Sequence, residues 1–312
     1  MRLLVYSFAF LKNVIYGLAV FFIGNLTETV DFLDVLAIRY LFSFVVMFAL
    51  KYLGILKIKV GIKDIFVKNE RTPYLKYVLI TALFEPVLEM FFETWGISMT
   101  TGITAAVICS LSPVMACIAE GIFLKEKTTL WQKIFLGMGI AGVLYIAVNT
   151  TSADGKDSIW GILILIMAIA SGAMYLTFSR KSGKSFSAME ISYVAVCLGM
   201  FVFNAANIVR HLIMGDILNY FAPCYSMENL IGFLFLSIFC TIVATGMNNF
   251  ALSKMQASTM SAFGGVSTLV TIAAGVLLND EKLYTFHFIG LTLILIRMIG
   301  VSYIQIKKDK NN

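Results

Sequence analysis

Ten long apolar segments, separated by short polar stretches, constrain this sequence more than any other feature. They lie at 8–25, 33–51, 75–98, 102–124, 131–149, 158–178, 189–212, 229–252, 256–278 and 285–306. Each is close to the roughly 20 apolar residues that carry a helix across a bilayer. They lack the alternation of membrane β-strands, so we expect helices. The chain is 59% hydrophobic and only 13% charged, which argues against a soluble enzyme and excludes intrinsic disorder.

The first segment, 8–25, could be either a membrane span or a signal peptide, because a charged start and a short apolar core are typical of a signal peptide as well. Lys12 and Asn13 interrupt this core, and no A-x-A cleavage motif follows it. We therefore interpret 8–25 as a membrane span, with Lys12 at its cytoplasmic end.

Charge placement predicts how the helices are oriented. With both termini in the cytoplasm, 19 of the 24 Lys and Arg residues fall on cytoplasmic ends and loops, 3 fall outside, and Arg39 and Arg297 lie within spans. This bias is the positive-inside signal expected of a cell-membrane protein, and an odd number of spans would remove it. The net charge of +6 is dispersed, so we interpret it as an orientation signal and not as a nucleic-acid surface.

The two halves of the chain, 1–155 and 156–312, are weakly similar. A shift of 155 residues places Glu126 on Glu281, among other matches. Five spans in each half require the second half to enter the membrane in the opposite orientation. Such inverted repeats are common in secondary transporters, whose binding site lies near the bilayer midplane. We expect an all-α integral membrane protein of ten transmembrane helices, built as two inverted five-helix repeats.

Short motifs recur at defined places along the spans. They are Tyr16-Gly17, Ala37-Ile38-Arg39-Tyr40, Leu111-Ser112-Pro113-Val114, Leu124-Lys125-Glu126-Lys127, Ala170-Ser171-Gly172-Ala173-Met174-Tyr175 and Asp280-Glu281-Lys282. In order and spacing, the chain resembles the EamA family of the drug/metabolite transporter superfamily. It departs from that family in span nine, which has Ser267 or Thr268 in place of a proline, and at Arg297 in span ten. The resemblance implies a transporter in which spans one to four and six to nine surround a central cavity, but one fold serves many substrates.

Three glutamates, Glu85, Glu89 and Glu93, stand in the third span. At a spacing of four residues they fall within about an 80° stripe of one helix face and climb about 12 Å along it. A carboxylate at the bilayer centre costs at least about 2.5 kcal/mol, and like charges also repel. The expected relief is a water-filled cavity, a bound cation or protonation. The structural alternative is pairing with an arginine, for which Arg39 and Arg297 are available.

Further candidates lie in the spans that should line this cavity. Asn248 and Asn249 would oppose the third span, where an amide can coordinate substrate or bond to another helix. Aromatic rings beside carboxylates can hold an ammonium group, although core packing is their commoner role. Prolines and glycines offer hinges or static kinks. The residues considered are Tyr16, Tyr175 and Trp95 for substrate contact, and Pro86, Pro113, Gly264 and Gly265 for gating.

No motif points to an enzyme or a cofactor. The sequence has no phosphate-binding loop, no G-x-S-x-G and no zinc motif. Its five cysteines form neither a CxxC pair nor a Cys/His cluster. We therefore expect no catalytic residue, no metal site and no cofactor, and energy from an ion gradient or from the substrate's own gradient.

We predict a secondary-active transporter of the cell membrane, with export favoured, for a small cationic or zwitterionic amine such as an amino acid. In this hypothesis the glutamates bind the substrate or couple protons. The partners are a small-molecule substrate, the lipid bilayer and protons; a homodimer is left open, and no nucleic acid is expected. The alternatives are a transporter of a neutral or anionic metabolite whose glutamates serve protons alone, and a non-transport membrane protein such as a lipid-linked scramblase.

Overall fold

The structure, a computed structural model, describes residues 2–56, 58, 72–123, 130–153, 158–182, 186–254, 263–281 and 284–310. Helices and their connections account for these residues, and no strand occurs among them. The α-helices are α1 (Arg2–Thr29), α2 (Phe32–Tyr52), α4 (Thr72–Ala82), α5 (Glu89–Ile97), α6 (Gly102–Cys109), α7 (Ser112–Phe123), α8 (Leu130–Ala153), α9 (Ile159–Ser182), α10 (Ala188–Met214), α11 (Met227–Leu234), α12 (Thr245–Leu252), α14 (Gly264–Leu278) and α15 (Thr285–Lys310). The described residues also include two π-helical segments, η1 (Leu83–Leu88) and η4 (Phe235–Ala244), and two 3₁₀ turns, η2 (Ile217–Asn219) and η3 (Ala222–Tyr225).

Six helical stretches of the described residues are long and apolar enough to cross a membrane. They are Leu4–Thr29, Phe32–Tyr52, Gly102–Phe123, Ile159–Ser179, Ala188–Met214 and Met227–Ala251. The expected all-helical, multi-pass architecture is thus confirmed, but the count of ten spans is not. Among the reasons, the third span carries three glutamates, Glu85, Glu89 and Glu93, and the described part of the ninth, α14, is a shorter apolar helix.

Local signals in the sequence define several helix ends. The Asp31 side chain caps α2 by accepting a hydrogen bond from the Leu33 N–H at 2.8 Å. Ser187 and Glu190 form a reciprocal capping box at the start of α10. Gly215 ends α10 in the left-handed conformation, with φ of 74°, which a glycine adopts without steric cost.

Two spans are interrupted at matching positions in the two halves. In the third span η1 joins α4 to α5, and Glu85 within it has an extended backbone, with φ −133° and ψ 118°. In the eighth span η4 joins α11 to α12. The 155-residue shift maps 83–88 onto 238–243, which lies inside η4. Such π segments are frequent at functional sites, because they rearrange the backbone hydrogen bonds of a helix.

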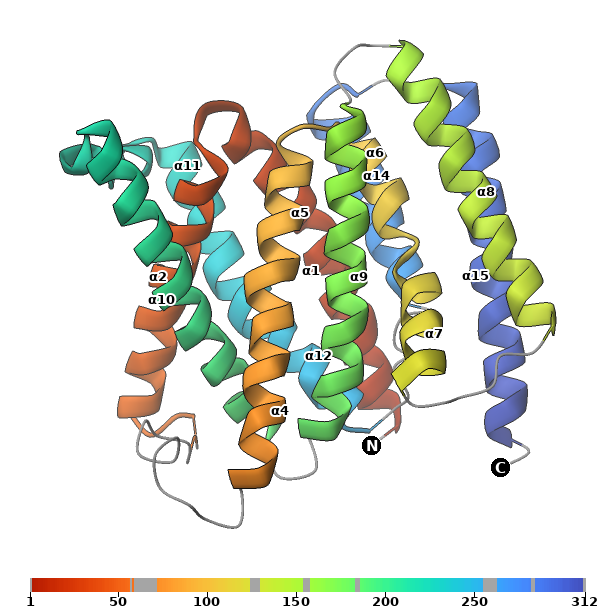
Figure 1. The fold of residues 1–312 in the computed structure, drawn as a ribbon, viewed down its shortest axis with the longest axis horizontal. Helices are drawn as coiled ribbons and strands as arrows, with labels where there is room; N and C mark the ends of the chain where they lie inside the picture. Colours follow the sequence, from red (N-terminus) through yellow and green to blue (C-terminus); the bar gives the residue numbers. More distant parts are fainter. Residues whose placement is uncertain are drawn as a thin grey trace.

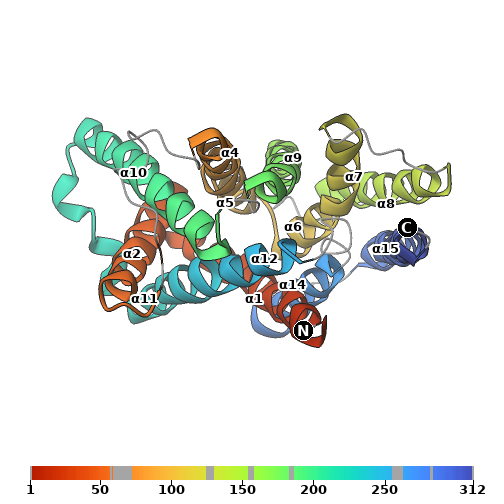
Figure 2. The same cartoon turned by 90° about the horizontal axis from the view of Figure 1, so that it is seen from below.

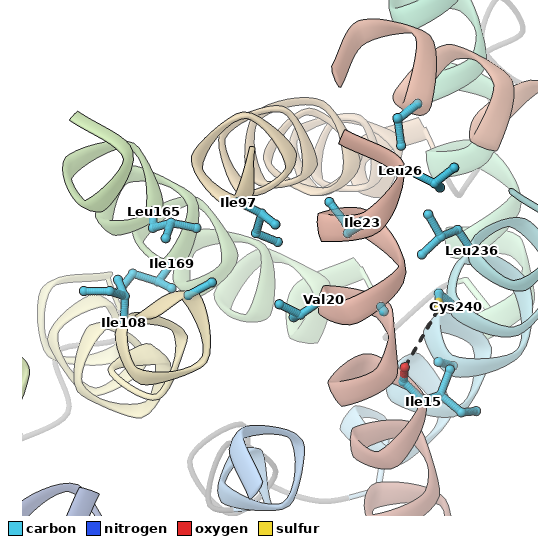
Figure 3. Close-up of a cluster of buried hydrophobic side chains, with 14 of the residues drawn as sticks. Ile15, Val20, Ile23, Leu26, Ile97, Ile108, Leu165, Ile169, Leu236 and Cys240 are labelled. Carbon is cyan, nitrogen blue, oxygen red and sulfur yellow. Dashed lines mark hydrogen bonds between the residues drawn. The ribbon is translucent and has the colours of Figure 1, made fainter. Parts of the chain in front are cut away.

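The helices form an elongated bundle (Figures 1 and 2). α8 packs against α15 at one end, and α2 packs against α10 at the other. Between these pairs, α1 packs on α14 and α5 packs on α9. Figure 3 shows a cluster of buried side chains in this core, where Ile23 of α1 lies between Ile97 of α5 and Leu236 of η4, and Leu165 of α9 lies beyond Ile97.

Candidate functional site

A cavity of about 180 Å³ lies between the central helices. Its walls come from α1, α2, η1, α5, α6, α7, α9, α12 and α14. The charged and polar residues among those lining it are Lys12, Asn13, Tyr16, Arg39, Tyr40, Glu85, Glu89, Glu93, Ser110, Ser112, Tyr175, Thr245, Asn248, Ser267, Thr268 and Thr271. Pockets for drug-sized ligands occupy ~300–1,000 Å³, so this cavity suits a smaller solute.

The three glutamates of the third span reach the cavity from two kinds of backbone. Glu89 and Glu93 lie one turn apart on α5, and both line the cavity. Glu85 precedes them in η1, where its extended backbone interrupts the helix. The sequence predicts one straight helical stripe of three carboxylates. In the structure only Glu89 and Glu93 share a regular helix, and Glu85 joins them from the break.

The carboxylate of Glu89 packs directly against Gly172 of α9. A Cβ atom built on Gly172 would lie 2.8 Å from Glu89 Cδ and 3.1 Å from Oε2, and closer still to Oε1. Glu89 Oε2 is buried and has no hydrogen-bond partner among the described residues. A buried acceptor without a donor costs about 1–3 kcal/mol. A proton or a ligand's donor would therefore be stabilised at this oxygen.

Lys12 brings a positive charge into the cavity from α1. Its Nζ lies 5.2 Å from the centroid of the Tyr16 ring. Its charge interacts with the carboxylates of Glu85 and, secondarily, Glu89. The charge count from the sequence assigns Lys12 to the cytoplasmic end of its span, which stays a prediction; the structure adds that Lys12 lines the cavity, one turn from Tyr16.

Arg39 brings a second positive charge from α2 and is only 4% exposed. Its Nε donates to Thr241 Oγ1 at 2.9 Å, and its charge interacts with Glu93. The described charged residues that line the cavity are therefore three carboxylates and two cations. When all five are ionised, one negative charge is left uncompensated. An uncompensated buried charge is costly, so this arrangement favours the uptake of a cation or a proton.

A hydrogen-bond chain fixes the polar side chains of α12 against α9. The Tyr175 hydroxyl donates to Asn249 Oδ1 at 2.6 Å and accepts from Asn248 Nδ2 at 3.1 Å. Because the hydroxyl proton is committed to Asn249, the Asn248 amide must present its N–H to Tyr175. Asn248 is 3% exposed, and its Oδ1 has no partner within the described part of the chain. The cavity therefore holds a second buried acceptor without a donor. The hydroxyl of Tyr16, also on the lining, lies within hydrogen-bond distance of Thr245 Oγ1, at 3.2 Å.

Trp95 is not among the residues that line the cavity. Its ring stacks on Phe32 with centroids 5.8 Å apart and meets Phe91 edge-on at 5.7 Å. The side chain therefore packs α5 against the start of α2, and the substrate contact considered from the sequence has no geometric support.

The four residues considered for gating lie where helices are interrupted or begin. Pro86 lies within η1. Pro113 is the second residue of α7, after the break that separates α7 from α6. Gly264 and Gly265 are the first residues of α14, and Gly264 lines the cavity. Breaks of this kind place bending points next to the cavity.

Sequence reasoning overlooked several lining residues. A signal for Lys12 existed, because a charged residue within a span is itself a reason to suspect function. Gly172 stands in a family-like motif, but nothing in that motif indicates that it packs against Glu89. In the sequence Ser267 and Thr268 stand out only where the family has a proline, yet both line the cavity from α14.

A second buried polar cluster, away from the cavity lining, joins α2 to α10. Asp34 accepts a hydrogen bond from Asn207 Nδ2 at 2.8 Å and forms an ion pair with Arg210. Its Oδ1 also lies 2.8 Å from His211 Nε2, and His211 Nδ1 lies 2.8 Å from Asp216 Oδ1. With Asp34 6% exposed, these contacts form a polar connection between the two helices.

The carboxylate of Glu281 caps α6. It accepts hydrogen bonds from the backbone N–H groups of Gly102 at 3.1 Å and Ile103 at 2.9 Å. A negative charge is stabilised at a helix N-terminus, where the first N–H groups lack partners within the helix. Glu281 thus connects the segment after α14 to the start of α6.

Comparison with known proteins places this architecture in a family. The model of the EamA-like transporter family matches residues 3–148 and, a second time, residues 159–303. The "Uncharacterized transporter YcxC" of Bacillus subtilis (strain 168) is 30% identical over 305 residues, which cover 98% of this chain and 95% of that protein. An "Uncharacterized transporter" of Archaeoglobus fulgidus is 27% identical over 226 residues, 71% of this chain and 74% of its own length.

A solved structure described only as "Crystal structure of protein" has a similar fold. Its TM-score is 0.61 at 13% sequence identity, and the match covers 94% of this chain and 98% of that one. At this identity the likeness concerns the fold alone, because one fold can carry many substrates.

Proposed function

Because this chain belongs to the EamA-like transporter family, we propose that it is a secondary-active transporter of a small cationic or zwitterionic amine. Ten transmembrane helices form two inverted repeats, 1–155 and 156–312, in the cell membrane. Both termini lie in the cytoplasm, a proposal supported by the positive-inside distribution of Lys and Arg. Export is the proposed direction, on the family resemblance.

The observation that carries this proposal is the charge of the cavity. Glu85, Glu89 and Glu93 outnumber Lys12 and Arg39 on a lining buried among helices. Residues this costly in a membrane protein are kept for substrate or ion pathways. In the proposed mechanism Glu85 and Glu89 bind the substrate's cationic group or exchange it for a proton.

Alternating access needs helices that can bend beside the site. Both η1 and the break between α6 and α7 lie against the cavity, and η4 occupies the position that matches η1 in the second half. Non-helical backbone is tolerated at membrane depth where it lines a cavity, and transporters use such breaks at their sites. Rocking of the third, fourth, eighth and ninth spans around these points opens the cavity to each side in turn.

One observation favours the alternative hypothesis, in which the substrate is neutral or anionic and the glutamates bind protons alone. Lys12 and Arg39 line the same cavity, and an anionic group would be attracted to them. The two hypotheses differ in which solutes are transported, so a panel of solutes distinguishes between them.

The test is transport by the full-length protein in proteoliposomes. Currents are recorded with amines, zwitterions, neutral metabolites and anions at two pH values, and radiolabelled counterflow detects electroneutral exchange. We expect transport of amines or zwitterions that depends on pH. Transport confined to neutral or anionic solutes would contradict the substrate class, and no transport across both assays would contradict the function.

The variant Glu89→Gln keeps the shape of the side chain and removes its charge. It should abolish coupled transport while the protein purifies and melts as the parent does. Glu228→Gln is the matched control, because Glu228 lies exposed on α11. A fully active Glu89→Gln protein would refute the mechanism.

A further inference from the structure

The proposed function leaves open which kind of amine the cavity takes. Two features bear on this choice: the buried acceptor atoms without donors, and the balance of charge on the lining. Both concern α5 and α12, which reach the cavity from the first and second halves of the chain.

Two buried oxygens on the lining lack a donor. Glu89 Oε2 and Asn248 Oδ1 are both without a hydrogen-bond partner among the described residues. Asn248 is 97% buried, and its Nδ2 is engaged by Tyr175. Both orphan atoms are acceptors, so their natural complement is a group that carries hydrogen-bond donors and no acceptor. A protonated primary or secondary amine is such a group, whereas a quaternary ammonium ion has no N–H to offer.

The charge balance of the lining favours a cargo with a single positive charge. Five described charged residues line the cavity, and they leave a single negative charge when all are ionised. A monocation neutralises this charge on binding. A zwitterion adds no net charge and leaves the deficit in place, and a dication overcompensates it.

Gly172 determines where this charge sits. Because no Cβ stands between α9 and the carboxylate, Glu89 packs against the helix backbone and is held beside the cavity. The charge of Lys12 interacts mainly with Glu85, and that of Arg39 interacts with Glu85 and Glu93. Glu89 is therefore the least compensated of the three carboxylates.

We propose that Glu89 and Asn248 form a subsite for one ammonium group bearing N–H donors. The cargo is then a monocationic primary or secondary amine, in preference to a quaternary ammonium ion or an amino acid. The identification of this amine as the transported cargo rests on the proposed function, whereas binding of an amine at the subsite can be measured independently of transport.

The test compares matched solutes that share a skeleton. One set is ethanolamine, choline and serine; the other is 2-phenylethylamine, its N,N,N-trimethyl form and phenylalanine. Each set keeps one side chain and changes only the ammonium substitution or adds a carboxylate. Binding to the purified full-length protein in detergent is measured by isothermal calorimetry and by the ligand-induced rise in melting temperature.

We expect the primary amine of at least one set to bind about tenfold or more tightly than its quaternary and amino-acid counterparts, since each lost charge-assisted hydrogen bond is worth about this much. Equal or tighter binding of the quaternary ion or the amino acid in both sets would overturn the proposal. So would the absence of binding by every primary amine.

Variants assign the binding to this subsite. Glu89→Gln and Asn248→Leu should each weaken amine binding about tenfold, whereas Glu228→Gln on the exposed face of α11 should leave it unchanged. Asn248→Asp places a second carboxylate in the subsite, beside Glu89. It should therefore raise the affinity for 1,4-diaminobutane relative to butylamine. That gain cannot arise from misfolding, and an unchanged ratio would contradict the role of Asn248.

The outcomes separate this inference from the proposed function. Amine binding that depends on Glu89, without transport in proteoliposomes, would keep the subsite and refute the transporter. Transport of neutral or anionic solutes without amine binding would keep the transporter and refute the subsite.

Discussion

Replacing Gly172 by alanine displaces the carboxylate of Glu89. The new Cβ would lie 2.8 Å from Glu89 Cδ and 3.1 Å from Oε2, whereas ordinary contact begins near 3.4 Å. Glu89 Cδ must therefore move by about 0.6 Å, and Oε1, which lies closer to the new Cβ, must move further. The three atoms nearest to the new Cβ all belong to Glu89. The end of a flexible side chain gives way here, and the backbone of α9 stays in place.

This geometry predicts a loss of function with little loss of stability. Overpacking costs about 1–3 kcal/mol in a rigid core, and we expect the lower limit because a mobile side chain yields. Alanine in place of a helical glycine returns about 1 kcal/mol, so the two effects nearly cancel. The displaced carboxylate loses its charge-assisted contact with the cargo, which should raise the apparent KM about tenfold.

The assay combines transport kinetics with thermal unfolding in detergent. Gly172→Ala should show a raised KM and a melting temperature within about 2 °C of the parent. Gly137→Ala on α8 is the matched control, because its Cβ would meet nothing within 4 Å. An unchanged KM would refute the placement of Glu89 at the substrate, and a large fall in melting temperature would show that α9 itself had moved.

Three further changes test other contacts. Asp34→Asn removes the charge facing Arg210 at a buried site and should cost about 3 kcal/mol in thermal unfolding, the lower limit for breaking a buried ion pair. Asp31 pairs with the same arginine but its side chain is 41% exposed, so Asp31→Asn should cost less than ~1 kcal/mol; equal losses would argue against the burial of Asp34. Glu281→Gln weakens the cap of α6 by about 0.5–1 kcal/mol, which hydrogen exchange at residues 102–106 should report as faster exchange, or else the cap is absent. Tyr175→Phe removes the partner of Asn248 Nδ2, whereas Asn249 is still held by Ser179 and Ser192. Amine binding should weaken several-fold in calorimetry; unaltered binding would show that Asn248 holds its orientation without Tyr175.

The sequence predicted the helical membrane architecture, because this property is local. A run of about 20 apolar residues must satisfy its backbone hydrogen bonds internally in a bilayer, and a helix does so. The capping residues Asp31 and Ser187 act within a few positions of themselves. The family motifs and the acidic third span could likewise be read along the chain, since they are defined by order and spacing.

The pairing of distant residues could not be read in this way. Gly172 against Glu89, Tyr175 between Asn248 and Asn249, and the connection of Asp34 to α10 all join separate helices. These contacts depend on how each helix is rotated about its axis. In a membrane protein the face toward lipid is as apolar as the face toward the core, so hydropathy does not determine that rotation.

Lys12 and Trp95 show where prediction from the sequence ends and the folded structure is needed. Apolar helices and three glutamates in one span follow from the amino-acid order alone, because composition and spacing act locally. The position of Lys12 on the cavity lining, and of Trp95 away from it, depends on the folded arrangement. A side chain's surroundings come from the packing of neighbouring helices, which are far away in sequence.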